Sequence, residues 1–218
     1  MTKVTIVYFS STGNTWETAR AIEQGAQQAG AQTRLRKVRE LAGPEAIAAK
    51  PAWQTHLDAT RNVPEATPAD IEWCDGYVFG SPTRFGLPAA QLKQFIDQAG
   101  GLWRDGGLAD KPVTAFTSAV NRHGGSEATI LSLANVFYHW GALIVPPGYT
   151  DPVVYAAGGN PYGTSFVTGP TGDGPDAEAL AAARYQGRRL AQVTIRLLGG
   201  VTDAARGGGN TRATGAAA

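Results

Sequence analysis

The sequence predicts an α/β fold in which a doubly wound, five-stranded parallel sheet carries helices on both faces. Strand-like runs alternate with helix-like segments along the chain, which is the pattern of parallel βαβ units. Most of these runs are apolar throughout, as in strands that are buried on both faces. The chain has 218 residues, of which 43% are hydrophobic and 17% charged, so it can bury one sizeable core.

The five predicted strands are short. In chain order they cover residues 3–9, 31–38, 75–80, 112–118 and 142–146. In a doubly wound sheet, ligands bind beyond the carboxyl ends of the strands, where the winding reverses. We therefore expect the loops after the first, third and fourth strands to carry the function.

Four helices are predicted from the hydrophobic periodicity, at residues 14–29, 88–98, 126–140 and 176–198. In the last helix, small and apolar side chains recur every three or four residues and form one face for packing on the sheet. The residues of this face are Leu180, Ala183, Gly187, Leu190, Ala191, Thr194 and Leu198.

Three segments do not follow the alternation of strands and helices. Residues 43–68 predict an irregular or partly helical insertion, and residues 149–175, rich in Gly, Pro, Thr and Tyr, predict a long loop or small hairpin near the site. Residues 201–218, with runs of Gly and Ala, predict a disordered tail after a domain that spans residues 1–200.

The turn between the first strand and the first helix has the composition of a phosphate site. The helix start supplies free N–H groups and a partial positive charge, and the hydroxyls supply further hydrogen-bond donors. Gly13 permits close approach of the backbone, and no lysine follows as a P-loop would require, so a monophosphate without Mg²⁺ is indicated. The alternative is an ordinary capped helix. The turn reads Ser10, Ser11, Thr12, Gly13, Asn14 and Thr15.

Two further loops lie at the same expected edge of the sheet. The third strand ends in a turn bounded by Ser81 and Gly86, whose backbone groups can meet the polar edge of a planar ring. The fourth strand runs into a loop of small residues before a helix that Ser126 caps. The candidate residues are Pro82, Thr83, Arg84 and Phe85 in the first loop, and Ser118, Ala119, Val120, Asn121 and Gly124 in the second. For Arg84 and Phe85, a surface salt bridge and a core aromatic are the alternatives, which the loop taken alone favours.

The sequence leaves open the roles of two aromatic side chains that lie near predicted helix ends. Trp103 follows Gly100-Gly101-Leu102, which suggests a large aromatic on a flexible stalk. It suits stacking on a planar ligand, but filling a core gap or a subunit interface is at least as compatible with this position. His139 precedes Trp140 at a helix end, where it can contact a ligand, pack, or cap carbonyl groups.

Composition excludes several functions. Nineteen Lys and Arg against eighteen Asp and Glu give a net charge of +1, which lacks the basic footprint of a nucleic-acid-binding protein. A single cysteine, Cys74, allows no internal disulfide, and no signal peptide or membrane-spanning run is recognisable, so we expect a cytoplasmic protein. Neither a nucleophile elbow nor metal-ligand spacing is present, so catalysis would have to come from a cofactor.

Taken in order, these motifs resemble the WrbA family, the type IV NAD(P)H:quinone oxidoreductases once described as tryptophan-repressor-binding proteins, which have a flavodoxin-like fold. The resemblance covers residue 3 to about residue 198. It is carried by the turn at residues 10–15 and by the runs Ser81-Pro82-Thr83-Arg84-Phe85-Gly86, Gly100-Gly101-Leu102-Trp103, Gly124-Gly125-Ser126-Glu127, Gly159-Asn160-Pro161-Tyr162-Gly163 and Ala183-Arg184-Tyr185-Gln186-Gly187.

The resemblance implies a role for each candidate. Residues 10–15 would bind the FMN phosphate, and the two loops after the third and fourth strands would bind the ring and ribityl chain. His139 would lie beside the isoalloxazine as a cofactor-binding and catalytic residue, and Trp103 would shape the substrate pocket, in the same or a neighbouring subunit. Thr12 stands where the family often has an aromatic that meets the nicotinamide, and Trp140 replaces a frequent histidine. Homodimers or homotetramers are implied.

The leading hypothesis is an FMN-dependent NAD(P)H:quinone oxidoreductase that transfers hydride from NADH or NADPH through flavin N5 and reduces a quinone by two electrons. One alternative is a flavodoxin-type electron carrier. Such carriers are usually markedly acidic, which a charge of +1 disfavours. The other alternative is a regulatory protein that binds the tryptophan repressor. No sequence feature supports this alternative.

Overall fold

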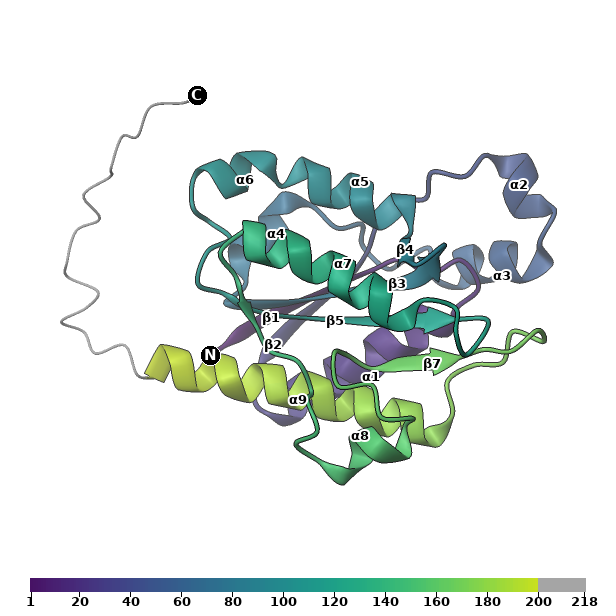
Figure 1. The fold of residues 1–218 in the computed structure, drawn as a ribbon. Coiled ribbons are helices and arrows are strands. Elements are labelled where there is room, and N and C mark those ends of the chain that lie inside the picture. The colour runs from purple at the N-terminus through teal and green to yellow at the C-terminus, as the bar shows by residue number, and fades with distance from the viewer. Residues whose placement is uncertain (200–218) are drawn as a thin grey trace.

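Five parallel strands form the main path of the sheet in the order β2-β1-β3-β5-β6, with helices on both faces (Figure 1). The computed structural model describes residues 1–199, and the tail predicted at residues 201–218 lies outside this part of the chain. The predicted fold class is confirmed. The strands are β1 (Lys3–Tyr8), β2 (Gln32–Lys37), β3 (Gly76–Arg84), β5 (Pro112–Ala119) and β6 (Leu143–Ile144).

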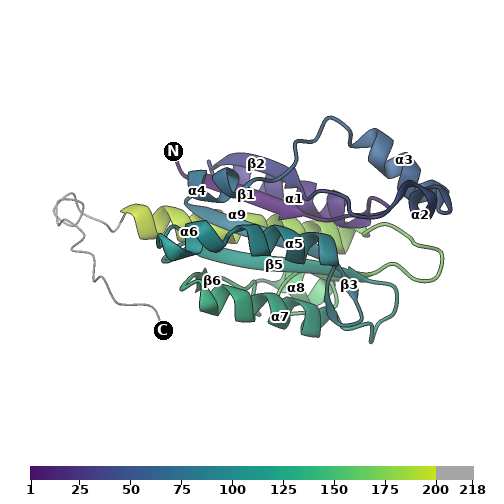
Figure 2. The same cartoon turned by 90° about the horizontal axis from the view of Figure 1, so that it is seen from above.

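The two faces of the sheet are covered by different helix pairs (Figures 1 and 2). Helices α1 (Asn14–Gln28) and α9 (Ala177–Gly199) pack on Val4, Ile6 and Tyr8 of β1. Helices α5 (Ala90–Gln98) and α7 (Ser126–His139) cover the other face, where they pack against the side chains of Val7 and Phe9. Because successive side chains of a strand point to opposite faces, one apolar run supplies both cores.

The backbones of helices α1 and α9 come into contact at two glycine residues. A Cβ on Gly187 would lie 2.0 Å from the carbonyl oxygen of Ile22, and one on Gly25 would lie 1.9 Å from that of Arg184. Only glycine allows the two backbones to come this close. Asp176 begins α9 by accepting a hydrogen bond from the Ala179 N–H at 2.7 Å, as a helix cap does.

The edge next to β5 is occupied by two short strands rather than the single strand predicted at residues 142–146. Strand β6 pairs with the start of β5, and β7 (Ser165–Val167) pairs in parallel with its end. The chain between them contains α8 (Pro152–Ala156). The small hairpin considered for residues 149–175 is therefore wrong, because β7 pairs with β5 and not within its own segment.

Strand β3 continues through the residues predicted as a turn and forms a hairpin with β4 (Leu87–Pro88), where Thr83 pairs with Pro88 and Arg84 with Leu87. The two residues of the hairpin loop, Phe85 and Gly86, have φ values of 54° and 79°. Positive φ at both positions is the geometry of a tight hairpin turn, and it is unusual for phenylalanine.

The segments between β2 and β3 and after α5 are helical. The first contains α2 (Pro44–Ala48), α3 (Pro51–Ala59) and α4 (Pro68–Trp73), each of which begins with the proline that suits a first helical position. The second is α6 (Gly100–Arg104), so the flexible stalk predicted for Trp103 is wrong. Trp140 is buried among Tyr77, Phe79 and Phe137, and it fills the core rather than a pocket.

Candidate functional site

The turn between β1 and α1 is held from several sides. Gly13, at φ 106°, donates its N–H to Ser10 Oγ at 3.0 Å and is followed by Asn14 as the first helical residue. Thr15 Oγ1 lies 3.2 Å from Ser118 Oγ at the end of β5. Asn14 Nδ2 donates to the carbonyl oxygen of Gly172 at 3.1 Å. The turn is thus fixed between β5 and the loop that precedes α9.

A cavity of about 450 Å³ opens at the carboxyl ends of β1, β3 and β5, beside this turn. This is the edge at which ligands bind in doubly wound sheets. Most of the predicted cofactor residues line it, from all three predicted loops. They are Ser10, Ser11, Thr12, Asn14 and Thr15 in the turn, Pro82, Thr83 and Arg84 at the end of β3, and Ser118, Ala119 and Val120 at the end of β5.

Four predicted residues support or border the cavity without lining it. Gly13 forms the backbone of the turn. Gly124 accepts a hydrogen bond from Thr83 Oγ1 at 3.3 Å, which joins the two loops, and its N–H donates to the Asn121 carbonyl at 2.9 Å within its own loop. Phe85 points into solvent and is fully exposed. Its side chain is free to meet a substrate or a second protein surface.

His139 and Trp103 lie together near the opposite ends of the strands from the cavity, where α6 and the last turn of α7 are found (Figure 1). Their rings stack with centroids 5.4 Å apart, and Trp103 Nε1 donates to the His139 carbonyl at 3.3 Å. Helix α7 has 14 residues. At 1.5 Å per residue, His139 is about 20 Å from the end of α7 that adjoins the cavity. Within one chain the pair is separate from the cavity.

The structure adds residues to the site that the sequence did not predict individually. Lys50, from the insertion between β2 and β3, lines the cavity on one side. The loop after β7 lines it on another, through Thr168, Gly169, Pro170 and Gly172. The Gly- and Pro-rich composition of this loop gave a signal for its general place near the site. No local signal marks Lys50, because only the fold brings it to the turn.

The chemistry of these residues fits FMN. The turn offers serine and threonine hydroxyls and the free N–H groups of a helix start, which together suit a phosphate. Among residues 1–199, Lys50 and Arg84 are the charged side chains that line the cavity, and no carboxylate of these residues lines it. Ser118, Ala119 and Val120 and the Thr83 region present backbone groups and small side chains, which suit a planar ring with polar edges.

Fold and site together define a flavodoxin-like α/β protein with a cavity for a phosphorylated planar cofactor. In residues 1–199 no helix is long and apolar enough to cross a membrane. The same residues contain no group of three His, Cys, Asp or Glu side chains placed to hold a metal ion.

Comparison with known proteins identifies the family. The model of the NADPH-dependent FMN reductase family matches residues 2–151, and the chain belongs to this family. It is similar to an NAD(P)H dehydrogenase (quinone) of Deinococcus radiodurans, with 46% identity over 197 residues, which covers 90% of this chain and 98% of that protein. A protein of the same name from Methylocella silvestris is 38% identical over 204 residues and is covered completely.

Solved structures agree on the fold. A flavodoxin, WrbA-like protein from Agrobacterium tumefaciens superposes with a TM-score of 0.62 and 21% identity, covering 90% of this chain and 99% of that one. An archaeal flavodoxin superposes with a TM-score of 0.57 and 16% identity, covering 88% and 99%. At these identities the likeness concerns the fold alone.

Proposed function

We propose that the protein is an FMN-dependent NAD(P)H:quinone oxidoreductase. The observation that carries this proposal is the cavity at the ends of β1, β3 and β5, where the hydroxyl-rich turn at residues 10–15 and the loops after β3 and β5 converge. The names of its relatives, NAD(P)H dehydrogenase (quinone), agree with this chemistry, and those relatives are covered almost completely by the chain. The overall reaction converts NAD(P)H, a quinone and a proton into NAD(P)⁺ and a hydroquinone.

The protein's part in this reaction is binding and orientation. FMN, when bound, supplies the hydride acceptor that links the nicotinamide to the quinone. Ser10, Thr12 and Thr15 hold the phosphate with the N–H groups of the turn. The hydrogen bond from Thr129 Oγ1 to Thr83 Oγ1, at 2.7 Å, fixes the hairpin that would face the ring. Fixing donors before the cofactor binds lowers the entropy lost on binding.

We further propose that a second copy of the chain completes the site with His139 and Trp103, in a homodimer or homotetramer. Trp103 is 46% exposed, although it stacks on His139. The rim of the cavity exposes the apolar side chains of Phe85 and Val120. An aromatic pair at one edge and an apolar rim at the other suit contact between copies. His139 would then supply the proton to the quinol oxygen, and Trp103 would cover the substrate.

A reducing, cytoplasmic location is also proposed. Cys74 is the single cysteine of the chain and is buried in the core, 2% exposed. Burial raises the pKa of its thiol, so the unreactive protonated form is favoured. A protein without an internal disulfide fits a compartment that keeps thiols reduced.

The proposed quinone reductase activity is tested by two rapid-mixing experiments on the FMN-loaded protein in the absence of oxygen. NADH or NADPH should bleach the flavin, and a benzoquinone added afterwards should restore its colour in a separate step. Steady-state rates should follow ping-pong kinetics, because donor and acceptor use the same cavity in turn. Bound flavin that stays oxidised for minutes with either nucleotide would favour the electron carrier instead.

A further inference from the structure

The insertion between β2 and β3 places a histidine behind the phosphate turn. His56, in α3, is 7% exposed, and its Nδ1 lies 3.5 Å from the point that a Cβ on Gly13 would occupy. Its ring centroid is 5.8 Å from that of Trp16 in the first turns of α1. The imidazole therefore packs against the back of the turn whose front faces the large cavity.

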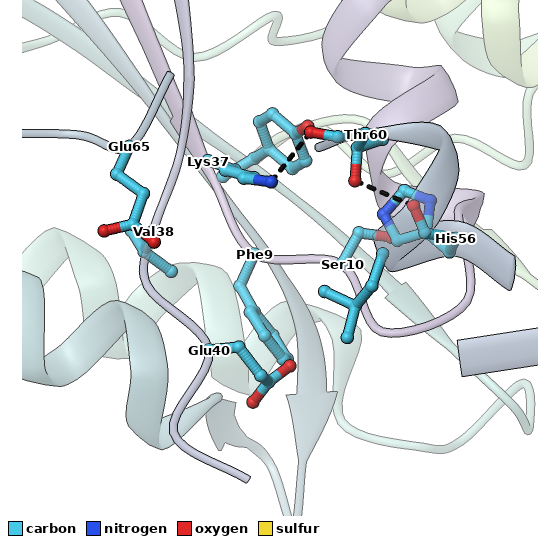
Figure 3. A pocket seen from close by; sticks show the side chains of 10 residues that line it. Phe9, Ser10, Lys37, Val38, Glu40, His56, Thr60 and Glu65 are labelled. Atoms are coloured by element: carbon cyan, nitrogen blue, oxygen red, sulfur yellow. Dashed lines mark hydrogen bonds between the residues drawn. The ribbon is translucent and has the colours of Figure 1, made fainter. Parts of the chain in front are cut away.

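A small cavity of about 70 Å³ separates His56 from β1 and β2 (Figure 3). Ser10 lines this cavity and the large one, so it forms the wall between them. Neither the Tyr8 hydroxyl nor the His56 ring donates or accepts a hydrogen bond with a residue of the described chain, and the Tyr8 hydroxyl is fully buried. The space suits a few water molecules and no organic ligand.

Among the residues that the structure describes, His56 forms no ion pair with a carboxylate. Lys37, from β2, lines the small cavity and donates to the Thr60 carbonyl at 2.7 Å. Glu40 and Glu65 line it as well, but Glu40 is bound by Trp53 Nε1 at 3.0 Å. Glu40 also accepts a hydrogen bond from Gln91 Nε2 at 2.7 Å. On the α1 side, Arg20 lies over the Trp16 ring, 5.0 Å from its centroid.

These surroundings determine the protonation state of the His56 imidazole when no ligand is bound. Burial, and after it the positive charge of Lys37, lowers the pKa of His56. The ring is therefore neutral near pH 7 as long as no anion lies nearby. A dianion brought close to it would favour the charged form and raise the pKa again.

Lys50, at the start of the same helix, brings a second cation to the front of the turn. It lines the large cavity, forms no ion pair with a residue of the described chain, and has its Nζ 5.9 Å from the centroid of the Trp53 ring. Only five residues of one short helix thus lie between a cation in the cavity and an imidazole behind its wall.

We propose that Lys50 and His56 are the cationic half of the cofactor-phosphate site: Lys50 contacts the phosphomonoester dianion within the cavity, and His56 takes up a proton behind the turn when the dianion binds. This inference rests on the proposed binding of FMN and assigns the recognition of its phosphate to the insertion. The turn alone supplies only dipoles and hydroxyls, whereas the dianion carries close to two charges.

The first experiment follows the titration of His56 in the wild-type protein by NMR of labelled histidine, with no ligand, with riboflavin and with FMN. The pKa of His56 should rise with FMN and stay unchanged with riboflavin, which has the ring but no phosphate. Calorimetry in buffers of different ionisation enthalpy should show proton uptake on FMN binding near pH 7.5, where the free phosphate is mostly dianionic. This uptake should be lost in H56Q and kept in the exposed control H123Q.

The second experiment compares dissociation constants for FMN and riboflavin. In K50Q the dissociation constant for FMN should rise about fivefold or more, as expected for an exposed cation that meets a dianion, with no change for riboflavin. The matched variant K93Q removes an exposed lysine that does not line the cavity and should change neither. Tight FMN binding with an unchanged His56 pKa, or equal effects of K50Q on both ligands, would overturn the proposal. Failure of the wild type to bind FMN would instead remove the proposed function.

Discussion

Asp70 shows how a single residue secures the edge of the sheet beside the insertion. Its carboxylate accepts from Arg36 Nε at 2.9 Å, from Arg34 Nη1 at 3.1 Å and from the Thr67 N–H at 3.0 Å. Burial acts to raise the pKa of Asp70, but the hydrogen bonds from Thr67 and the charge of Arg36 outweigh it and lower the pKa. The charged form therefore stabilises the fold.

We expect Asp70→Asn to lower the free energy of unfolding by about 2 kcal/mol at pH 7, because charged hydrogen bonds are lost in a buried setting. Since the folded-state pKa is depressed, this stability is present above the unfolded pKa of about 4 and is lost as the pH falls through the folded value. Urea unfolding at several pH values measures it. The curves of variant and wild type should converge in acid, and Asp97→Asn, which breaks only an exposed ion pair with Lys93, should lower the free energy of unfolding by less than about 1 kcal/mol.

Gly13 sets the geometry of the turn between β1 and α1 through its positive φ of 106°. We expect Gly13→Ala to strain the turn by about 1–2 kcal/mol and to weaken FMN binding about tenfold, with the fold retained. Fluorescence titration of FMN measures the effect. Gly43→Ala is the control, since Gly43 has φ −68° and no atom within 4 Å of an added Cβ. Equal affinities for both variants would show that the turn is not the phosphate site.

The residues of the turn were accessible to prediction because their signal is local. Hydroxyl side chains and a glycine follow directly on an apolar strand and precede a helix, so one window of sequence contains the whole motif. Lys50 and His56 carry no such signal. They reach the turn because α3 packs behind it, as His56 does beside Gly13, and that placement depends on contacts between residues that are more than 30 positions apart.

At the scale of elements, the contact of α1 with α9 depends on glycine at the crossing point. We expect Gly187→Ala to destabilise the protein by about 2–3 kcal/mol, because the new methyl group would meet the Ile22 carbonyl and force the helices apart. Thermal and urea unfolding measure this. Gly100→Ala, in α6 with open space around it, should be neutral or slightly stabilising. A stable Gly187→Ala protein would mean that the helices separate without loss.

The elements that the sequence predicted are the long ones, and those it missed are short. The long helices and the four longer strands carry clear periodicity or continuous apolar runs. The hairpin at Thr83 to Pro88 was missed because its loop places phenylalanine where asparagine or aspartate usually signals a tight turn. Strand β7 has three residues, and only its partner β5 makes it a strand.

At the scale of the whole molecule, the separation of His139 and Trp103 from the cavity leads to a prediction about assembly. A protein with Trp103→Ala lacks one half of the proposed shared site, and one with Gly13→Val lacks the other. Each should be weakly active alone, whereas co-expressed chains should form hybrids with some complete sites and regain a fraction of wild-type turnover. Light scattering should show a dimer or tetramer. Activity that never exceeds the sum of the two variants would contradict the shared site.

The sequence by itself determined the sheet with its helices, the glycine-containing turn between β1 and α1, and most of the residues around the cavity. These features follow from local composition and from the rule that parallel strands end at one edge. The tertiary structure decided which distant segments join them: Lys50 and the loop at Thr168 enter the cavity, His56 packs behind the turn, and His139 lies a helix length away. Such distances are set by how helices pack and how long they are, and no single stretch of sequence contains them.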